Sequence, residues 1–121
     1  MSKRILIIED QEDNRRIMRD LLTASGYGVI EAMTGEEGLE LARREVPDLI
    51  LMDIQLPGMD GYEVTRRIKA DGALKPIPVI AVTSYALSGD DRKAYAAGCD
   101  GYVTKPVSPK VLLAKIREYV P

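Results

Sequence analysis

Carboxylate, hydroxyl and ammonium side chains stand at the ends of four short apolar stretches in this sequence. Glu9 and Asp10 follow the first stretch, Asp53 the second, Thr83 the third, and Lys105 a weaker fourth. Three converging carboxylates repel one another, and a hard divalent cation such as Mg²⁺ would relieve this by taking their oxygens as ligands. A carboxylate beside such a cation, with a hydroxyl and an ammonium aimed at the same point, suits phosphoryl transfer.

Asp53 is the best-placed nucleophile of the set. It ends the central expected strand, and the turn-forming residues 57–61 (PGMDG) that follow leave its side chain accessible. Lys105 and the cation would neutralise phosphoryl oxygens, Thr83 would donate a hydrogen bond, and attack by Asp53 would give an acyl phosphate. Each residue alone has an ordinary explanation as a turn former, a cap or a solvated lysine. Their combination at four strand ends favours the chemical interpretation.

Five strands are expected to position these side chains. Residues 5–8, 49–52 and 79–82 are continuous apolar runs too short for free-standing helices, and they predict strands buried on both faces, as in parallel sheets. Residues 29–32 and 102–104 are weaker and more polar. They predict strands nearer the edges of the sheet.

Segments with helical periodicity alternate with these strands. The expected inward residues of the five helices are Ile17, Met18, Leu21 and Leu22; Leu39, Ala42 and Val46; Val64 and Ile68; residues 94–97; and Leu112, Ile116 and Val120. Thr34 with Glu37 predicts a capping box, and Ser108 with Pro109 predicts the start of the last helix. Right-handed crossovers then give an α/β fold with a doubly wound, five-stranded parallel sheet, whose ligand site lies outside the carboxyl ends of the strands.

The composition fits a single domain over residues 1–121. With 45% hydrophobic and 30% charged residues the chain can bury a core, and its net charge of −2 disfavours nucleic-acid binding. The chain has no His, which excludes Ser-His-Asp catalysis and a role as a phosphohistidine carrier. Its one Cys forms no internal disulfide, and no apolar run reaches the ~20 residues of a membrane span. We therefore expect a cytoplasmic protein.

The chain resembles the receiver domain of two-component response regulators over nearly its whole length. The matching segments are residues 7–10 (IIED), 51–61 (LMDIQLPGMDG), 82–83 (VT) and 98–106 (GCDGYVTKP). This combination is highly specific. The resemblance implies a flavodoxin-like (βα)5 fold with strand order 2-1-3-4-5.

The resemblance also implies a phosphorylation site. Asp53 would accept a phosphoryl group from a histidine kinase or a histidine phosphotransfer protein. Asp10, Asp53 and the backbone carbonyl of Gln55 would hold Mg²⁺, with Glu9 acting through water. Glu9 is one methylene longer than the Asp often found there, which leaves direct and water-mediated coordination both open. Gln55 also occupies a position that tunes the rate of phosphoryl loss in this family.

Other positions of the family motif carry switch roles. Thr83 and Lys105 would contact the phosphoryl group, and Tyr102 would turn inward when Thr83 is drawn to it. Tyr85 would tune the rate of phosphoryl loss together with the residue two after the acceptor. Pro106 would follow a cis peptide bond.

Signal output is expected through protein partners. The chain ends at Pro121 after the last expected helix and carries no DNA-binding module, as in single-domain regulators; residues 52–57 and 105–108 look most like the DivK-type cell-cycle regulators. Phosphorylation would shift the face formed by the fourth helix, fifth strand and fifth helix, which includes Tyr95 and Tyr102, and so control binding of a downstream signalling protein. A monomer or weak dimer is expected, with catalysis limited to its own phosphorylation and dephosphorylation.

Several alternatives stay open or are disfavoured. A receiver excised from a hybrid histidine kinase would look much the same, and a scaffold receiver that is never phosphorylated is a further alternative. A haloacid-dehalogenase-type phosphatase needs a second acid where this chain has Gln55, and a flavodoxin needs a phosphate loop where residues 11–13 are Gln-Glu-Asp.

Arg15, Arg16 and Arg19 lie on the first expected helix beside the site. They either meet the phosphodonor or form a solvated basic face. Cys99 is interpreted as a small packing residue, because nothing cationic adjoins it in the sequence.

Overall fold

The structure, a computed structural model, describes residues 3–84 and 90–121, in which strands and helices alternate. The strands are β1 (Arg4–Ile8), β2 (Gly28–Ala32), β3 (Leu49–Asp53), β4 (Val79–Thr83) and β5 (Gly101–Thr104). The helices are α1 (Glu12–Ala24), α2 (Gly35–Glu45), α3 (Gly61–Ala70), α4 (Asp90–Ala97) and α5 (Pro109–Arg117). All five expected strands form, within one residue of their expected bounds.

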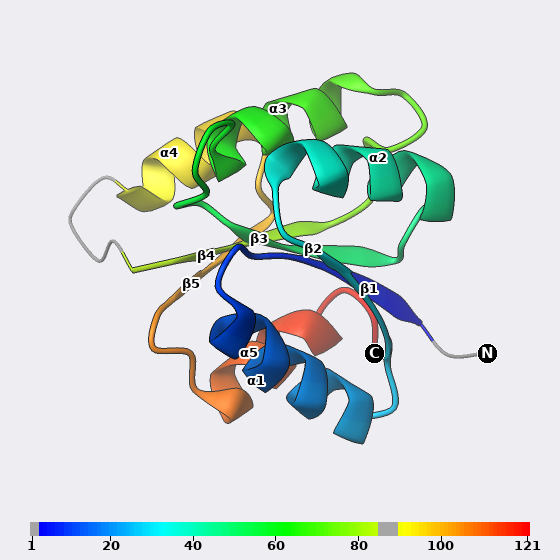
Figure 1. The fold of residues 1–121 in the computed structure, drawn as a ribbon, viewed down its shortest axis with the longest axis vertical. Helices are drawn as coiled ribbons and strands as arrows, with labels where there is room; N and C mark the ends of the chain where they lie inside the picture. The colour runs from blue at the N-terminus through cyan, green and yellow to red at the C-terminus, as the bar shows by residue number, and fades with distance from the viewer. Residues whose placement is uncertain (1–2, 85–89) are drawn as a thin grey trace.

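The strands build one parallel sheet in the order β2-β1-β3-β4-β5, which confirms the predicted topology. Helices α2, α3 and α4 cover one face of the sheet, and α1 and α5 cover the other (Figure 1). Ile8 pairs with Met52, Asp53 with Val82, and Thr83 with Thr104. The carboxyl ends of β1, β3, β4 and β5 therefore meet at one edge of the sheet.

Successive strand residues alternate between two buried clusters, one on each face of the sheet. Leu6 and Ile8 of β1 pack on the side of α2 and α3, whereas Ile5 and Ile7 pack on the side of α1 and α5. The strand is apolar throughout because both of its faces are covered.

Four residues predicted to face inward are instead exposed, namely Ile17, Val46, Tyr95 and Ala96. Ile17 is 61% exposed, because the buried stripe of α1 runs along Arg15, Met18 and Leu22, and Ile17 lies outside this stripe, nearly opposite Arg15 on the helix. Val46 is 52% exposed, because it is the C-cap of α2, with a left-handed φ of 44°, and lies past the last helical turn. In α4, Ala94 and Ala97 are buried, but Tyr95 is 51% exposed and Ala96 is exposed as well. These four predictions were wrong.

The predicted helix starts form with one difference. The Thr34 hydroxyl accepts a hydrogen bond from the amide of Glu37 at 3.1 Å, and the Glu37 carboxylate accepts one from the amide of Met33 at 2.7 Å. Ser108 precedes α5 as predicted, but within the described residues its side chain makes no capping hydrogen bond.

Cys99 is a buried free thiol in the cluster between the sheet and helices α2 to α4. Its thiol donates a weak hydrogen bond to the Thr65 hydroxyl at 3.7 Å. Burial raises the pKa of the thiol to about 11, so it stays neutral at physiological pH. Cys99 therefore serves in packing.

Candidate functional site

The acidic side chains at the ends of β1 and β3 lie together. Because β1 and β3 are neighbouring parallel strands with Ile8 opposite Met52, the next residue on each strand, Glu9 and Asp53, also lie side by side. One carboxylate oxygen from each of Glu9, Asp10 and Asp53 lies within 4.8 Å of the others. Glu9 and Asp53 are buried, whereas Asp10 is partly exposed. The structure thus brings together the three acids that the sequence analysis selected.

Lys105 brings a cation to these acids from the loop after β5. Its ammonium lies 2.9 Å from Oε1 of Glu9 and 3.5 Å from Oδ1 of Asp53. The backbone amide of Lys105 donates to the carbonyl of Thr83 at 2.7 Å, which ties this loop to the end of β4. The peptide bond between Lys105 and Pro106 is cis. The closer ion pair is with Glu9, a pairing that the sequence analysis did not predict.

The titration of these groups reflects their crowding. Burial raises the pKa of Glu9, the neighbouring Asp53 raises it further, and the hydrogen bond from Lys105 opposes the rise. Partial burial and the neighbouring Glu9 raise the pKa of Asp10. Burial lowers the pKa of the Lys105 ammonium, but its hydrogen bond to Glu9 and the charge of Asp53 outweigh this and leave that pKa raised. The acids carry unfavourable negative charge, which a divalent cation would stabilise, so the oxygen donor set fits Mg²⁺.

We expect a pH-dependent stability difference between the wild type and a Glu9→Gln variant in metal-free buffer. The pKa of Glu9 is raised above its ordinary value of 4.5, so the folded state binds more protons than the unfolded state just above pH 4.5. Glu9 therefore costs stability increasingly as the pH rises from about 4.5 through its folded-state pKa. The Gln amide oxygen can still accept the hydrogen bond from Lys105, but it carries no charge.

Urea denaturation between pH 4 and pH 8 with a chelator measures this difference. The variant should gain stability relative to the wild type as the pH rises, and the gain should then level off. A Glu12→Gln variant controls for the removal of one exposed carboxylate from the same segment. If the stability gain of Glu9→Gln over the wild type stayed constant or fell with rising pH, the result would contradict the burial of a charged Glu9 carboxylate.

The Asp53 carboxylate is held by the loop that follows it. Its Oδ1 accepts a hydrogen bond from the amide of Gln55 at 3.0 Å. The amide of Ile54 donates to Val82 at 3.1 Å, and the amide of Gly61 donates to the carbonyl of Ile54 at 3.1 Å. The start of α3 is thereby folded against the backbone of Asp53 and Ile54.

Gln55 also bridges two loops of the site. Its side-chain Oε1 accepts a hydrogen bond from the amide of Ser84, the residue after β4, at 2.7 Å. The sequence analysis assigned Gln55 a metal-binding carbonyl and a rate-tuning role, and it did not predict this bridge. The role of its backbone carbonyl stays a prediction.

The two predicted switch residues share one face of the sheet. Thr83 is fully buried at the end of β4, and Tyr102 is partly buried against the cluster beneath α2, α3 and α4. In the register of β4 and β5, Ala81 pairs with Tyr102 and Thr83 with Thr104. Thr83 and Tyr102 are therefore diagonal neighbours on this face. Tyr85, the other predicted rate-tuning residue, lies outside the described residues.

One residue at the site was misjudged from the sequence. Arg15 was assigned to an exposed face of the first helix, but it is 8% exposed and donates to the backbone carbonyl of Glu9. The signal was present in the sequence, because residues 15, 18 and 22 share the spacing of one helical stripe.

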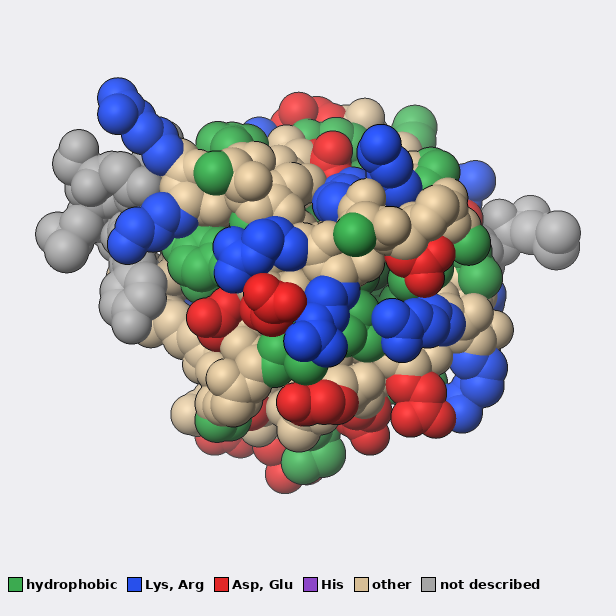
Figure 2. Space-filling view, turned by 90° about the horizontal axis from the view of Figure 1, so that it is seen from above, with side chains coloured by type: hydrophobic (Ala, Val, Ile, Leu, Met, Phe, Trp, Pro, Cys, Tyr) green, Lys and Arg blue, Asp and Glu red, His purple; other side chains and the backbone are tan. Residues whose placement is uncertain are grey.

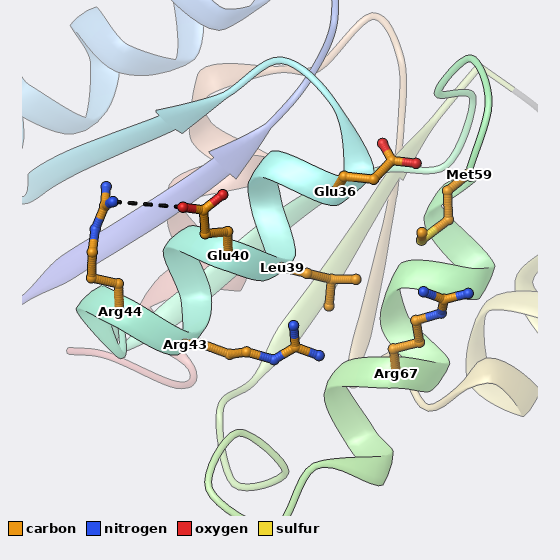
Figure 3. Close-up of a pocket in the computed structure, with 7 residues that line it drawn as sticks. All are labelled: Glu36, Leu39, Glu40, Arg43, Arg44, Met59 and Arg67. Carbon is orange, nitrogen blue, oxygen red and sulfur yellow. Dashed lines mark ion pairs between the residues drawn. The ribbon is translucent and has the colours of Figure 1, made fainter.

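A separate groove lies between α2 and α3, away from these residues. This open groove has a volume of about 570 Å³ and is lined by Leu39 and Met59 together with charged side chains (Figure 3). Of these, Arg44 pairs with Glu40 at 3.9 Å. Figure 2 looks onto the face formed by α2, α3 and α4, where basic and acidic side chains are interspersed. The charges of the groove are thus largely balanced by neighbours.

Comparison with known proteins agrees with this geometry. The response regulator receiver domain family matches residues 5–117. The polar-differentiation response regulator DivK of Brucella ovis is 48% identical over 120 residues, covering 99% of this chain and 98% of DivK. DivK of Brucella anthropi is also 48% identical over 120 residues, with the same coverage.

Solved structures have the same fold. A CheY-like response regulator receiver domain protein from Methanospirillum hungatei superposes with a TM-score of 0.89 at 38% identity, covering 98% of this chain and 93% of that one. The receiver domain of a sensor histidine kinase from Pseudomonas aeruginosa superposes with a TM-score of 0.92 at 33% identity, covering 99% of this chain and 98% of its own. That structure has a magnesium ion coordinated in its active-site cleft. The chain therefore belongs to the response regulator receiver domain family of two-component signalling, and it is DivK-like.

Proposed function

We propose that residues 1–121 form one receiver domain that acts as a phosphorylatable switch, with Asp53 as its phosphoryl acceptor. The observation that carries this proposal is the buried Asp53 carboxylate, which lies with Glu9 and Asp10 in a cluster of oxygens within 4.8 Å of one another. The Lys105 ammonium lies 3.5 Å from the same carboxylate. A carboxylate, further oxygens of the kind that bind Mg²⁺ and an ammonium thus lie together, and this arrangement supports phosphoryl transfer to Asp53.

In the proposed reaction an Asp53 oxygen attacks the phosphorus of a phosphohistidine on a histidine kinase or a phosphotransfer protein. The bond between phosphorus and the imidazole nitrogen breaks as the bond to the Asp53 oxygen forms, and the imidazole takes up a proton from solvent. Asp10, Asp53 and the Gln55 carbonyl would hold Mg²⁺, with Glu9 near them. When bound, Mg²⁺ supplies neutralisation of the phosphoryl oxygens.

Lys105 and Thr83 act on the acceptor side of this reaction. The Lys105 ammonium, already between Glu9 and Asp53, would neutralise a second phosphoryl oxygen. Thr83 would donate its hydroxyl to the phosphoryl group. Because Tyr102 shares a face of the sheet with Thr83, a movement of Thr83 changes the space open to Tyr102 and hence the surface formed by α4, β5 and α5. A downstream signalling protein would read this surface, as proposed for a DivK-like regulator of the cell cycle.

The phosphodonor would dock next to the site. A hollow of about 160 Å³ lies beside Glu9 and Lys105, and its walls include Met18 and Pro106. Ile17, which is 61% exposed, also lines this hollow. An exposed apolar side chain beside the acceptor is a natural contact for a helix of the donor.

Within residues 3–84 and 90–121, no helix is long and apolar enough to span a membrane.

Intact-mass spectrometry after incubation with acetyl phosphate tests the proposal. One phosphoryl adduct should form with Mg²⁺, and little or none when the metal is removed by a chelator. Should acetyl phosphate give no adduct, the same measurement with a phosphorylated histidine kinase follows. A folded protein that stays unmodified with both donors would overturn the switch in favour of a scaffold that is never phosphorylated.

A further inference from the structure

We propose that Arg15 is a positioning residue for the cation site: its guanidinium holds the backbone carbonyls of Glu9 and Asp10 and so fixes the acidic pair for Mg²⁺. The inference rests on the proposed function, because it assumes that the acidic cluster binds the cation. It assigns a role in metal affinity to an arginine that contacts neither the phosphoryl acceptor nor a carboxylate of the acidic pair in the described structure.

The contacts of Arg15 are specific. Its Nη1 donates to the carbonyl of Glu9 at 3.0 Å and to the carbonyl of Asp10 at 3.3 Å. Its Nε lies 3.4 Å from Oε1 of Glu31 on β2. The side chain is 10% exposed. The guanidinium therefore joins three elements: the first turns of α1, the loop that leaves β1, and the neighbouring strand β2.

The hydrogen bonds of Arg15 hold the backbone of Glu9 and Asp10, two of the three clustered acidic residues. The three carboxylates repel one another, and without restraint the loop after β1 would relax to separate them. The amide of Glu9 is held by the carbonyl of Ala32 at 3.0 Å, and Arg15 holds the carbonyl of the same residue. Because the backbone amide and the backbone carbonyl of Glu9 are both held by hydrogen bonds, the direction in which its side chain leaves the backbone is fixed. For Asp10, the contact with Arg15 fixes the carbonyl that follows its Cα.

Arg15 acts through geometry more than through its charge. The pKa values of Glu9 and Asp10 are raised, and the cation that opposes this rise is Lys105. Partners that orient metal ligands in this indirect way typically change metal affinity by about 10- to 100-fold when they are removed. We therefore expect an effect on cation affinity that is separable from an effect on folding.

The structure supplies a matched control on the same helix. Arg19 also pairs with Glu31, at 3.2 Å, and it lies near Asp20. Among the described residues it makes no hydrogen bond to the carbonyl of Glu9 or Asp10. Replacing Arg19 therefore removes an arginine from the Glu31 network without touching the acidic pair.

The experiment compares Arg15→Met, Arg15→Lys and Arg19→Met with the wild type. Isothermal titration with MgCl2 gives the dissociation constant, and urea denaturation with and without Mg²⁺ gives the stability gained on binding. Arg15→Met should raise the Mg²⁺ dissociation constant about tenfold, whereas Arg19→Met should stay within about twofold of the wild type. Arg15→Lys keeps the charge on a compact ammonium that cannot bridge the same three oxygens, so it should also weaken binding, by a smaller factor.

Each result has a defined meaning. Equal Mg²⁺ affinity in the wild type and Arg15→Met overturns the positioning role, even if Arg15→Met is less stable without metal. If Arg15→Met does not fold, Arg15→Lys decides the question by the same comparison. A folded wild type that binds no Mg²⁺ overturns the proposed cation site itself, and the inference about Arg15 with it. For the proposal to hold, saturating Mg²⁺ must also restore the phosphorylation rate of Arg15→Met toward that of the wild type.

Discussion

An Asp53→Asn variant is expected to take up no phosphoryl group from acetyl phosphate under conditions that modify the wild type. A carboxylate oxygen is a nucleophile for phosphorus, whereas the amide oxygen and nitrogen of Asn are not. The variant should fold, because the Asn amide oxygen can still accept the hydrogen bond that the Gln55 amide donates to Oδ1 of Asp53 at 3.0 Å. Removing one of three crowded charges also relieves repulsion in the metal-free protein. The expected effect is thus complete loss of the adduct without loss of structure.

Intact-mass spectrometry measures this loss, and an Asp60→Asn variant is its control. Asp60 lies in the same loop and caps α3 by accepting a hydrogen bond from the amide of Glu63 at 3.0 Å. Asn caps helices about as well as Asp, so this variant should be as stable and as readily modified as the wild type. A phosphoryl adduct on Asp53→Asn would show that another residue is the acceptor.

A Gly61→Ala variant is expected to be destabilised by about 3 kcal/mol, at the upper end of the usual cost of overpacking. A Cβ at residue 61 would lie 2.4 Å from the carbonyl oxygen of Asp53 and 2.7 Å from the Cα of Ile54. Both are backbone atoms, so no side-chain rotation relieves the clash and the loop after β3 must shift. The shift would also break the hydrogen bond from the Gly61 amide to Ile54. Because this loop holds Asp53, the proposed acceptor, phosphorylation of Asp53 should slow as well.

Urea denaturation gives the free energy of unfolding, and Gly72→Ala is the matched substitution. A Cβ at Gly72 would meet no atom of the described residues within 4 Å. The same Gly→Ala change should therefore alter stability there by less than about 1 kcal/mol, in either direction. Equal stabilities for the two variants would contradict the close approach of α3 to the end of β3.

The sequence alone was sufficient to predict the sheet and the meeting of Glu9, Asp10 and Asp53 at one of its edges. Runs such as residues 49–52 are apolar at every position because the sheet is covered on both faces, and such a run is recognisable without a structure. Asp53 directly follows one of these runs. Since parallel strands all end at the same edge of a sheet, the residues that end β1, β3 and β4 had to lie near one another. Residues that directly follow different strands in the sequence are therefore neighbours in the folded protein.

The tertiary structure alone decided how side chains share partners and which side of each helix is buried. Arg15 and Ile17 lie on nearly opposite sides of α1, and their hydrophobicity predicted burial of Ile17, whereas the structure buries Arg15. Arg15 can be buried because its guanidinium finds hydrogen-bond acceptors there. These are the backbone carbonyls of Glu9 and Asp10, which follow β1, and the Glu31 carboxylate on β2. Likewise, Lys105 pairs more closely with Glu9 than with Asp53, across 96 residues of sequence. Periodicity records the average polarity of a face, whereas a buried charge depends on individual oxygens that only the assembled fold brings within reach.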